Sequence, residues 1–141
     1  MWIDVKTESD VEEYLKATQI CDDYSYRLVS VEFKTFKNQY SADSCGLLLI
    51  LENEAVGRLE MFFQNVIHFS FSGQNDCNIG KADRCELEIR TDLLGKTRND
   101  RLILWTDGCK VLHRNGVFDA SQDNSKIIAY NLKYRIIKNE E

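Results

Sequence analysis

Residues 128–136 read Ile-Ala-Tyr-Asn-Leu-Lys-Tyr-Arg-Ile, and this stretch decides the fold. Every second side chain is large and apolar or aromatic, namely Ile128, Tyr130, Leu132, Tyr134 and Ile136. Because successive side chains of a strand point to opposite faces, a period of two predicts a strand with one buried face. The stretch therefore predicts a long strand at the end of the chain, with these five side chains on its buried face.

The same period recurs through the preceding chain, at residues 29–33, 59–63, 67–71 and 85–91. Residues 45–51 instead form a continuous apolar run, which is typical of a strand that is covered on both faces. Asn65 separates two alternating stretches and predicts a bulge or a turn. Asp107-Gly108 predicts a hairpin between strands at 102–106 and 109–113, since a tight type I′ turn needs positive φ at both central residues. The count is seven or eight strands.

One segment has helical spacing instead. Val11, Tyr14, Leu15 and Thr18 follow the i, i+3, i+4, i+7 pattern, and Ser9 with Glu12 fits a capping box. We expect a helix over about residues 8–19. Parallel strands need crossover connections, which are usually helices, and no helical pattern lies between the strands, so the sheet must be largely antiparallel. The chain is predicted to be a single α+β domain over residues 1–141: a mainly antiparallel curved sheet or sandwich with one N-terminal helix.

Composition narrows the classes of function. The 141 residues include 18 Lys and Arg against 23 Asp and Glu, a net charge of −5, which disfavours binding to nucleic-acid phosphates. No apolar run is long enough to span a bilayer, and the N-terminus shows no signal-peptide pattern, so we expect a cytoplasmic protein without membrane contact. The five cysteines are an odd, scattered set without a C-x-x-C pair, which predicts free thiols.

No motif demands an enzyme. A calcium loop that began at Asp76 would need a glutamate at its twelfth position, which is Leu87, and no glycine-rich phosphate loop is present. We therefore expect neither a metal nor a cofactor, and we assign no catalytic residue. The alternative is a small hydrolytic enzyme that uses the carboxylates of Asp22 and Asp23 or the His68, Ser70 and Ser72 face.

The connection after the helix is the strongest candidate site. Asp22 and Asp23 precede Tyr24 there, and loops that join rigid elements often carry function, while Tyr is enriched at interface hot spots. An acidic surface attracts a cationic partner. We therefore expect a basic protein partner to contact Asp22, Asp23, Tyr24, Glu52 and Glu54. The oligomeric state stays open.

A resemblance supports this interpretation. The helix, the acidic connection, residues 59–66 (Leu-Glu-Met-Phe-Phe-Gln-Asn-Val) and residues 127–132 (Ile-Ile-Ala-Tyr-Asn-Leu) together resemble small bacterial proteins of unknown function, some of them suspected immunity proteins of toxin systems. Such proteins often carry a Phe-His-Asp-like triplet after the helix. The corresponding residues here are Cys21, Asp22 and Asp23, of which Asp23 alone matches. The resemblance implies a non-enzymatic, immunity-like module that neutralises a basic partner such as a nuclease toxin.

Overall fold

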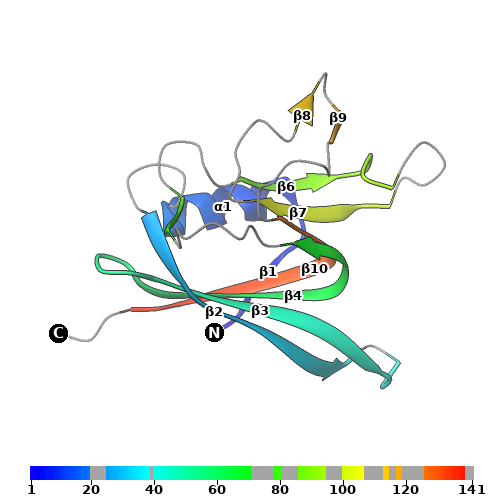
Figure 1. Ribbon diagram of the computed structural model, residues 1–141, viewed down its shortest axis with the longest axis horizontal. Coiled ribbons are helices and arrows are strands. Elements are labelled where there is room, and N and C mark those ends of the chain that lie inside the picture. Colours follow the sequence, from blue (N-terminus) through cyan, green and yellow to red (C-terminus); the bar gives the residue numbers. More distant parts are fainter. Residues whose placement is uncertain are drawn as a thin grey trace.

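One helix lies against a large antiparallel sheet (Figure 1). The structure is a computed structural model that describes residues 1–19, 25–38, 40–70, 78–80, 86–94, 100–106, 113–114, 117–118 and 126–138. Its elements are β1 (Ile3–Val5), α1 (Glu8–Thr18), β2 (Ser25–Lys37), β3 (Asp43–Asn53), β4 (Gly57–Ser70), β5 (Asn78–Gly80), β6 (Glu86–Arg90), β7 (Leu102–Thr106), β8 (His113–Arg114), β9 (Val117–Phe118) and β10 (Lys126–Ile137).

The strands follow the order β5-β2-β3-β4-β10-β7-β6, and their pairings are antiparallel. The last strand, β10, is central. It pairs with β4 along its length, while its other edge is shared between β7 at Lys126–Ala129 and β1 at Leu132–Tyr134. The sheet curves without closing into a barrel, and β8 and β9 form a separate small hairpin. The predicted α+β class with a mainly antiparallel sheet and an N-terminal helix is confirmed.

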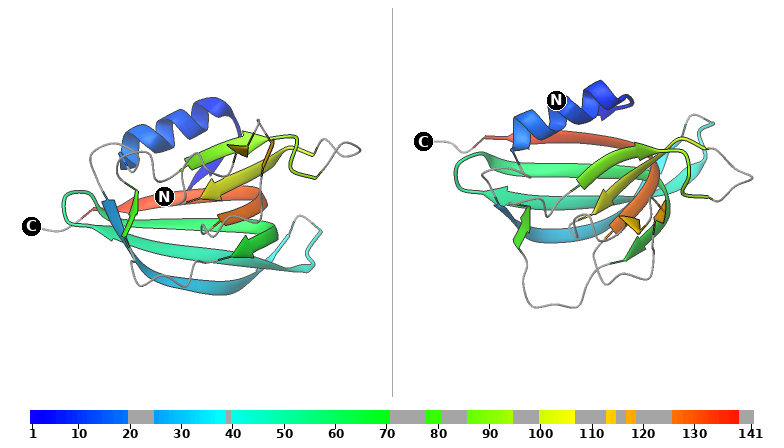
Figure 2. Two further views of the ribbon diagram at one scale, coloured as in Figure 1. Left: turned by 45° about the horizontal axis from the view of Figure 1, so that its top comes forward. Right: turned by 90° about the horizontal axis from the view of Figure 1, so that it is seen from above.

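The sheet has two faces with different environments. The inner face carries the buried side chains of Leu49, Met61 and Tyr134, and α1 covers part of it (Figure 2). The ring of Tyr14 on α1 meets the ring of Tyr134 edge-on at 5.2 Å, and its hydroxyl contacts the Met61 sulfur at 3.5 Å. Burial, together with the nearby charges of Glu13 and Asp10, raises the pKa of Tyr134. The opposite, outer face carries the side chains of Leu48, Phe62 and Lys133, which lie side by side on β3, β4 and β10.

The cap of the helix lies two residues before the position that the sequence suggested. Thr7 is the N-cap: its hydroxyl accepts from the backbone N–H of Asp10, and the Asp10 carboxylate accepts from the N–H groups of Thr7 and Lys6. These backbone N–H groups also hold the pKa of Asp10 below its ordinary value. The predicted capping box of Ser9 and Glu12 is wrong, because both residues already lie inside α1.

The predicted alternation of the last strand is wrong in its first half. Ile127 and Ala129 share the main core with Leu132 and Tyr134, whereas Ile128 packs with Leu102 and Leu104 in a second cluster. The interruption lies at Tyr130 and Asn131, two consecutive exposed residues of β10. Asn131 pairs with Gln64 of β4, and the next residue, Asn65, has a left-handed φ of 56°. The register between the strands shifts close by, at Ile67, between the pairs Ile128–His68 and Ala129–Val66. β4 therefore does not turn at Asn65 but continues through a bulge over Asn65–Ile67, and the inward-facing positions of β10 change from odd to even numbers across Tyr130 and Asn131.

Two further expectations concern single strands. The apolar run of residues 45–51 lies in β3: Cys45 is exposed and Leu48 half-buried, whereas Leu47, Leu49, Ile50 and Leu51 are buried, so the strand is covered on both faces beyond Cys45. The hairpin predicted at Asp107-Gly108 is wrong. β7 pairs with β6 on one side and with β10 on the other, so no edge of it is left for residues 109–113. The dipeptide itself lies outside the described residues.

Candidate functional site

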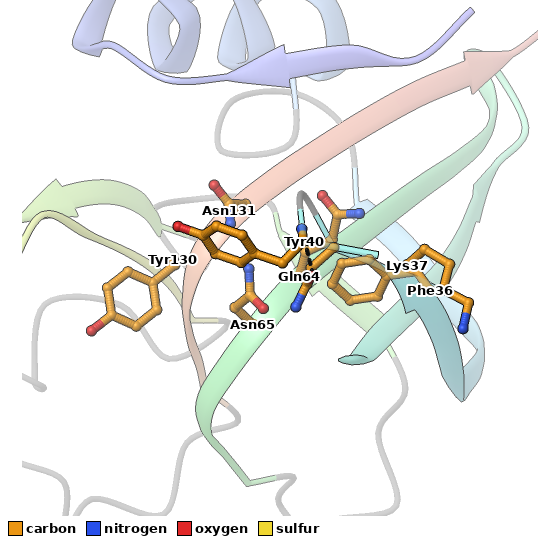
Figure 3. A pocket seen from close by; sticks show the side chains of 8 residues that line it. Phe36, Lys37, Tyr40, Gln64, Asn65, Tyr130 and Asn131 are labelled. Carbon is orange, nitrogen blue, oxygen red and sulfur yellow. Dashed lines mark hydrogen bonds between the residues drawn. The ribbon is translucent and has the colours of Figure 1, made fainter. Parts of the chain in front are cut away.

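A hollow of about 540 Å³ opens beside the bulge of β4 (Figure 3). It lies between the turn that joins β2 to β3 and the middle of β4 and β10. Its lining consists of aromatic and amide side chains with one lysine: Phe36, Lys37, Asn38, Tyr40, Gln64, Asn65, Tyr130 and Asn131. The left-handed Asn65 and the exposed Tyr130 are both consequences of the bulge, so the same irregularity that redirects the core also shapes the hollow.

The β2–β3 turn forms one wall, and its conformation is held by Asn38. The side-chain oxygen of Asn38 accepts from the backbone N–H groups of Tyr40 at 2.8 Å and of Ala42 at 3.2 Å. Its amide nitrogen donates to the Ser44 hydroxyl at 3.1 Å. The side chain of Asn38 thus replaces backbone partners inside the turn. Tyr40 is held at the rim in consequence, with 80% of its surface exposed.

Three amide side chains form the floor. Gln64 and Asn131 lie directly opposite each other on β4 and β10, and Asn65 follows Gln64 at the bulge. Throughout the part of the chain that the structure describes, none of these three side chains makes a hydrogen bond. Each amide offers two N–H donors and a carbonyl acceptor. The floor therefore presents hydrogen-bonding capacity that a ligand can use.

The charges near the hollow favour a cation over an anion. Lys37 is neutralised by Asp43, with 2.6 Å between ammonium and carboxylate. The Tyr130 hydroxyl donates to the carboxylate of Asp100 at 2.6 Å, which brings a negative group to the edge of the site. Aromatic ring faces and amide oxygens also attract positive charge. The arrangement suits a guanidinium or ammonium group, which would contact ring faces and carbonyl oxygens together.

The outer face already holds two of its own cations over aromatic rings. Lys133 lies 5.2 Å from the centre of the Trp2 ring and 5.5 Å from that of Phe62, and the Arg135 guanidinium lies 4.4 Å from Trp2. The Phe62 ring in turn meets Phe36 edge-on at 5.7 Å. Phe36 therefore contacts this row of rings and cations through Phe62, and it also lines the hollow.

Two of the contact residues expected from the sequence, Glu52 and Glu54, are described by the structure, and neither lines the hollow. Asp22, Asp23 and Tyr24 lie outside the described residues. Glu52 lies near the far end of β3, where its carboxylate accepts from Arg27 of β2 at 2.9 Å. Glu54 is exposed in the following turn, whose backbone N–H groups bond to the Asn53 side chain. The two described acids therefore lie at the end of β3 that is far from the hollow, and we call this end of the sheet the acidic edge.

Of the residues of the hydrolytic alternative, the structure describes His68 and Ser70; Asp22 and Asp23 lie outside the described residues. His68 is exposed and Ser70 is half-buried on β4, while Ser72 lies outside the described residues. Among the residues that the structure describes, no three His, Cys, Asp or Glu side chains are grouped to hold a metal ion, and no helix is long and apolar enough to cross a bilayer. Cys45 carries a free, exposed thiol; the other four cysteines are not described, so their free thiols stay a prediction.

Sequence reasoning missed the hollow because its amides occupy the polar positions of alternating strands. Asn65, which predicted a bulge, was the one local signal near it. Comparison with models of protein families, with curated proteins and with solved structures found no match.

Proposed function

We propose that this protein is a non-enzymatic binding protein for a basic protein partner, as an immunity-like module would be. The observation that carries the proposal is the hollow beside the β4 bulge. Three amides without hydrogen-bond partners in the described structure converge there with the rings of Phe36, Tyr40 and Tyr130. An arginine or lysine side chain of the partner would enter the hollow, with its charge over the rings and its N–H groups on the amide oxygens.

Long-range charge supports the same class of partner. A net charge of −5 attracts a cationic protein and accelerates association, an effect that weakens as salt rises. In this proposal the carboxylates of Glu52, Glu54, Asp22 and Asp23 guide the approach, while Tyr24 and the hollow supply the short-range contacts.

A titration with two matched peptides tests the proposal. One capped peptide carries three arginines, and the other carries three citrullines, which have nearly the same shape without the charge. We expect the arginine peptide to bind and the citrulline peptide to bind at least about fivefold more weakly, as the loss of cation–π and ionic contacts implies. Isothermal titration calorimetry or fluorescence would supply the two dissociation constants.

Neutral substitutions in the hollow separate this site from general attraction to an acidic protein. Tyr40→Ala and Asn131→Ala leave the net charge unchanged, so we expect each to weaken arginine-peptide binding by about two- to fivefold. Tyr40→Phe keeps the ring and serves as the matched control, with affinity near that of the wild type. Equal binding of both peptides, or binding that is indifferent to Tyr40→Ala and Asn131→Ala, would overturn the proposal.

A further inference from the structure

The outer edge of β2 is a long strand edge with few occupied backbone groups. β2 runs over 13 residues from Ser25 to Lys37. β5 pairs with its first three residues, Ser25–Arg27, and in the described part of the chain no strand pairs with the outer edge of residues 28–37. Such an edge presents a row of backbone N–H and C=O groups that can pair with another strand.

No proline interrupts this edge; its protective features are an irregularity between Leu28 and Ser30 and the charged side chains of the strand. The chain contains no proline, and the unpaired part of β2 exposes Val31 at 37% and Phe33 at 63%. Phe33 already meets Phe69 edge-on at 5.3 Å, so an additional ring would extend an existing aromatic contact. On the opposite side of the strand, the charged pair Glu32 and Lys34 flanks Phe33, and neither side chain makes an ion pair within the described structure.

The sequence of this edge is self-complementary in one register. Two antiparallel copies of β2 related by a two-fold axis at Phe33 place residues whose numbers add to 66 opposite each other. Glu32 then faces Lys34 of the second copy, and the symmetry repeats this contact. Phe33 faces Phe33, and Val31 faces Thr35. Directly opposed side chains of opposite charge stabilise an antiparallel pair, and opposed aromatic rings do so as well.

The two nearest registers do not place Glu32 opposite Lys34. A shift by one residue to an axis at Glu32 puts the two Glu32 carboxylates opposite each other, and an axis at Lys34 does the same with two ammonium groups. Like charges placed directly opposite destabilise a strand pair. The charges therefore select the register at Phe33 from its closest alternatives.

We propose that this protein forms a symmetric dimer in which the β2 edges of two copies pair antiparallel around Phe33 and join the two sheets into one. The interface is isologous, as a two-fold axis requires. Phe36 and Lys37 belong both to the paired stretch of β2 and to the lining of the hollow, so the dimer interface lies next to the hollow. Each hollow is still formed within one copy, and Glu52 lies at the other end of β3.

Sedimentation equilibrium of the full chain and of charge-swap variants tests this proposal. We expect the wild type to dimerise with rising protein concentration. Glu32→Lys and Lys34→Glu each place like charges opposite each other twice, so each should weaken dimerisation by about tenfold or more. The double variant restores both pairs in reversed order and should dimerise within about threefold of the wild type. A mixture of the two single variants should form a heterodimer, because two lysines of the first variant then face two glutamates of the second.

A wild type that remains monomeric at all concentrations would overturn the proposal. So would single variants that dimerise as tightly as the wild type, or a double variant without rescue. Since arginine-peptide binding is measured separately, failure of the dimer and failure of the binding function give different results.

Discussion

The ring of Phe62 on β4 lies over Gly46 on β3, at a position where no side chain would fit. A Cβ atom at Gly46 would lie 2.7 Å from Cζ of Phe62, and closer still to its Cε1. Leu48 is the direct partner of Phe62, so Gly46 is its diagonal neighbour. The missing side chain allows Phe62 to cross above β3 and reach Phe36 on β2, at 5.7 Å between ring centres. Gly46 thus supports the wall of the hollow without lining it.

Gly46→Ala should destabilise the protein because the new methyl group and the Phe62 ring compete for the same space. We expect a loss of about 1–3 kcal/mol in the free energy of unfolding, which is the usual cost of overpacking. In a Phe62→Ala background the same substitution should cost less than about 0.5 kcal/mol. Urea unfolding of the four proteins of this double-mutant cycle measures the coupling. Equal costs of Gly46→Ala in both backgrounds would show that the ring is not the obstacle.

Glu60 should matter far more than Glu52, although both carboxylates bind arginine. Glu60 is 4% exposed on the outer face; its carboxylate accepts a hydrogen bond from Arg135 at 2.5 Å and forms an ion pair with Arg58 at 2.8 Å. Glu60→Gln would leave two arginines without their carboxylate, so we expect a loss of about 2 kcal/mol or more. Glu52→Gln breaks an exposed pair and should cost less than about 1 kcal/mol. Guanidinium unfolding of both variants gives the comparison, and similar losses would contradict it.

The cap of α1 can be assigned by two matched substitutions. Thr7→Ala removes the hydroxyl that accepts from Asp10 and should destabilise the protein by about 1 kcal/mol. Ser9→Ala removes a similar hydroxyl from inside the helix and should change the free energy of unfolding by less than about 0.5 kcal/mol. Thermal unfolding followed by circular dichroism measures both. A larger loss for Ser9→Ala than for Thr7→Ala would move the cap back to the position that the sequence suggested.

Asp10 should make stability depend on pH in acid. The N–H groups of Lys6 and Thr7 lower its pKa in the folded protein below the ordinary value of 3.8. As pH falls, the unfolded chain therefore takes up this proton first, so the stabilisation is present above pH 3.8 and is lost as pH falls through the folded pKa. Asp10→Asn lacks this titration. The stability advantage of the wild type over Asp10→Asn should shrink below about pH 4, and an advantage that grows with acid would contradict the assignment.

The spacing of apolar residues in the sequence was sufficient to predict the helix and the antiparallel sheet, because each has its own period of apolar side chains. It was not sufficient for the cap, since Thr7 with Asp10 and Ser9 with Glu12 satisfy the same spacing rule.

Features that depend on the pairing of distant strands could not be read from single segments. In the sequence the apolar alternation of residues 128–136 continues through Tyr130, whereas in the structure Tyr130 and Asn131 are both exposed and the inward-facing positions change there, beside the bulge of β4. Gln64 and Asn131 become neighbours through the same pairing, across 67 positions of the chain, which is the difference of their numbers. The hollow is therefore a product of register, and no local motif marks it.

The most direct test of the central claim locates the binding site of a cation on the protein itself. The side-chain NH₂ groups of Gln64, Asn65 and Asn131 give resonances in a ¹H–¹⁵N correlation spectrum, and the arginine peptide can be titrated into the labelled protein. The account predicts saturable shifts of these three resonances and of the Tyr40 backbone amide, with the citrulline peptide producing much smaller ones. Shifts confined to the acidic edge around Glu52 and Glu54, with the hollow unchanged, would contradict it.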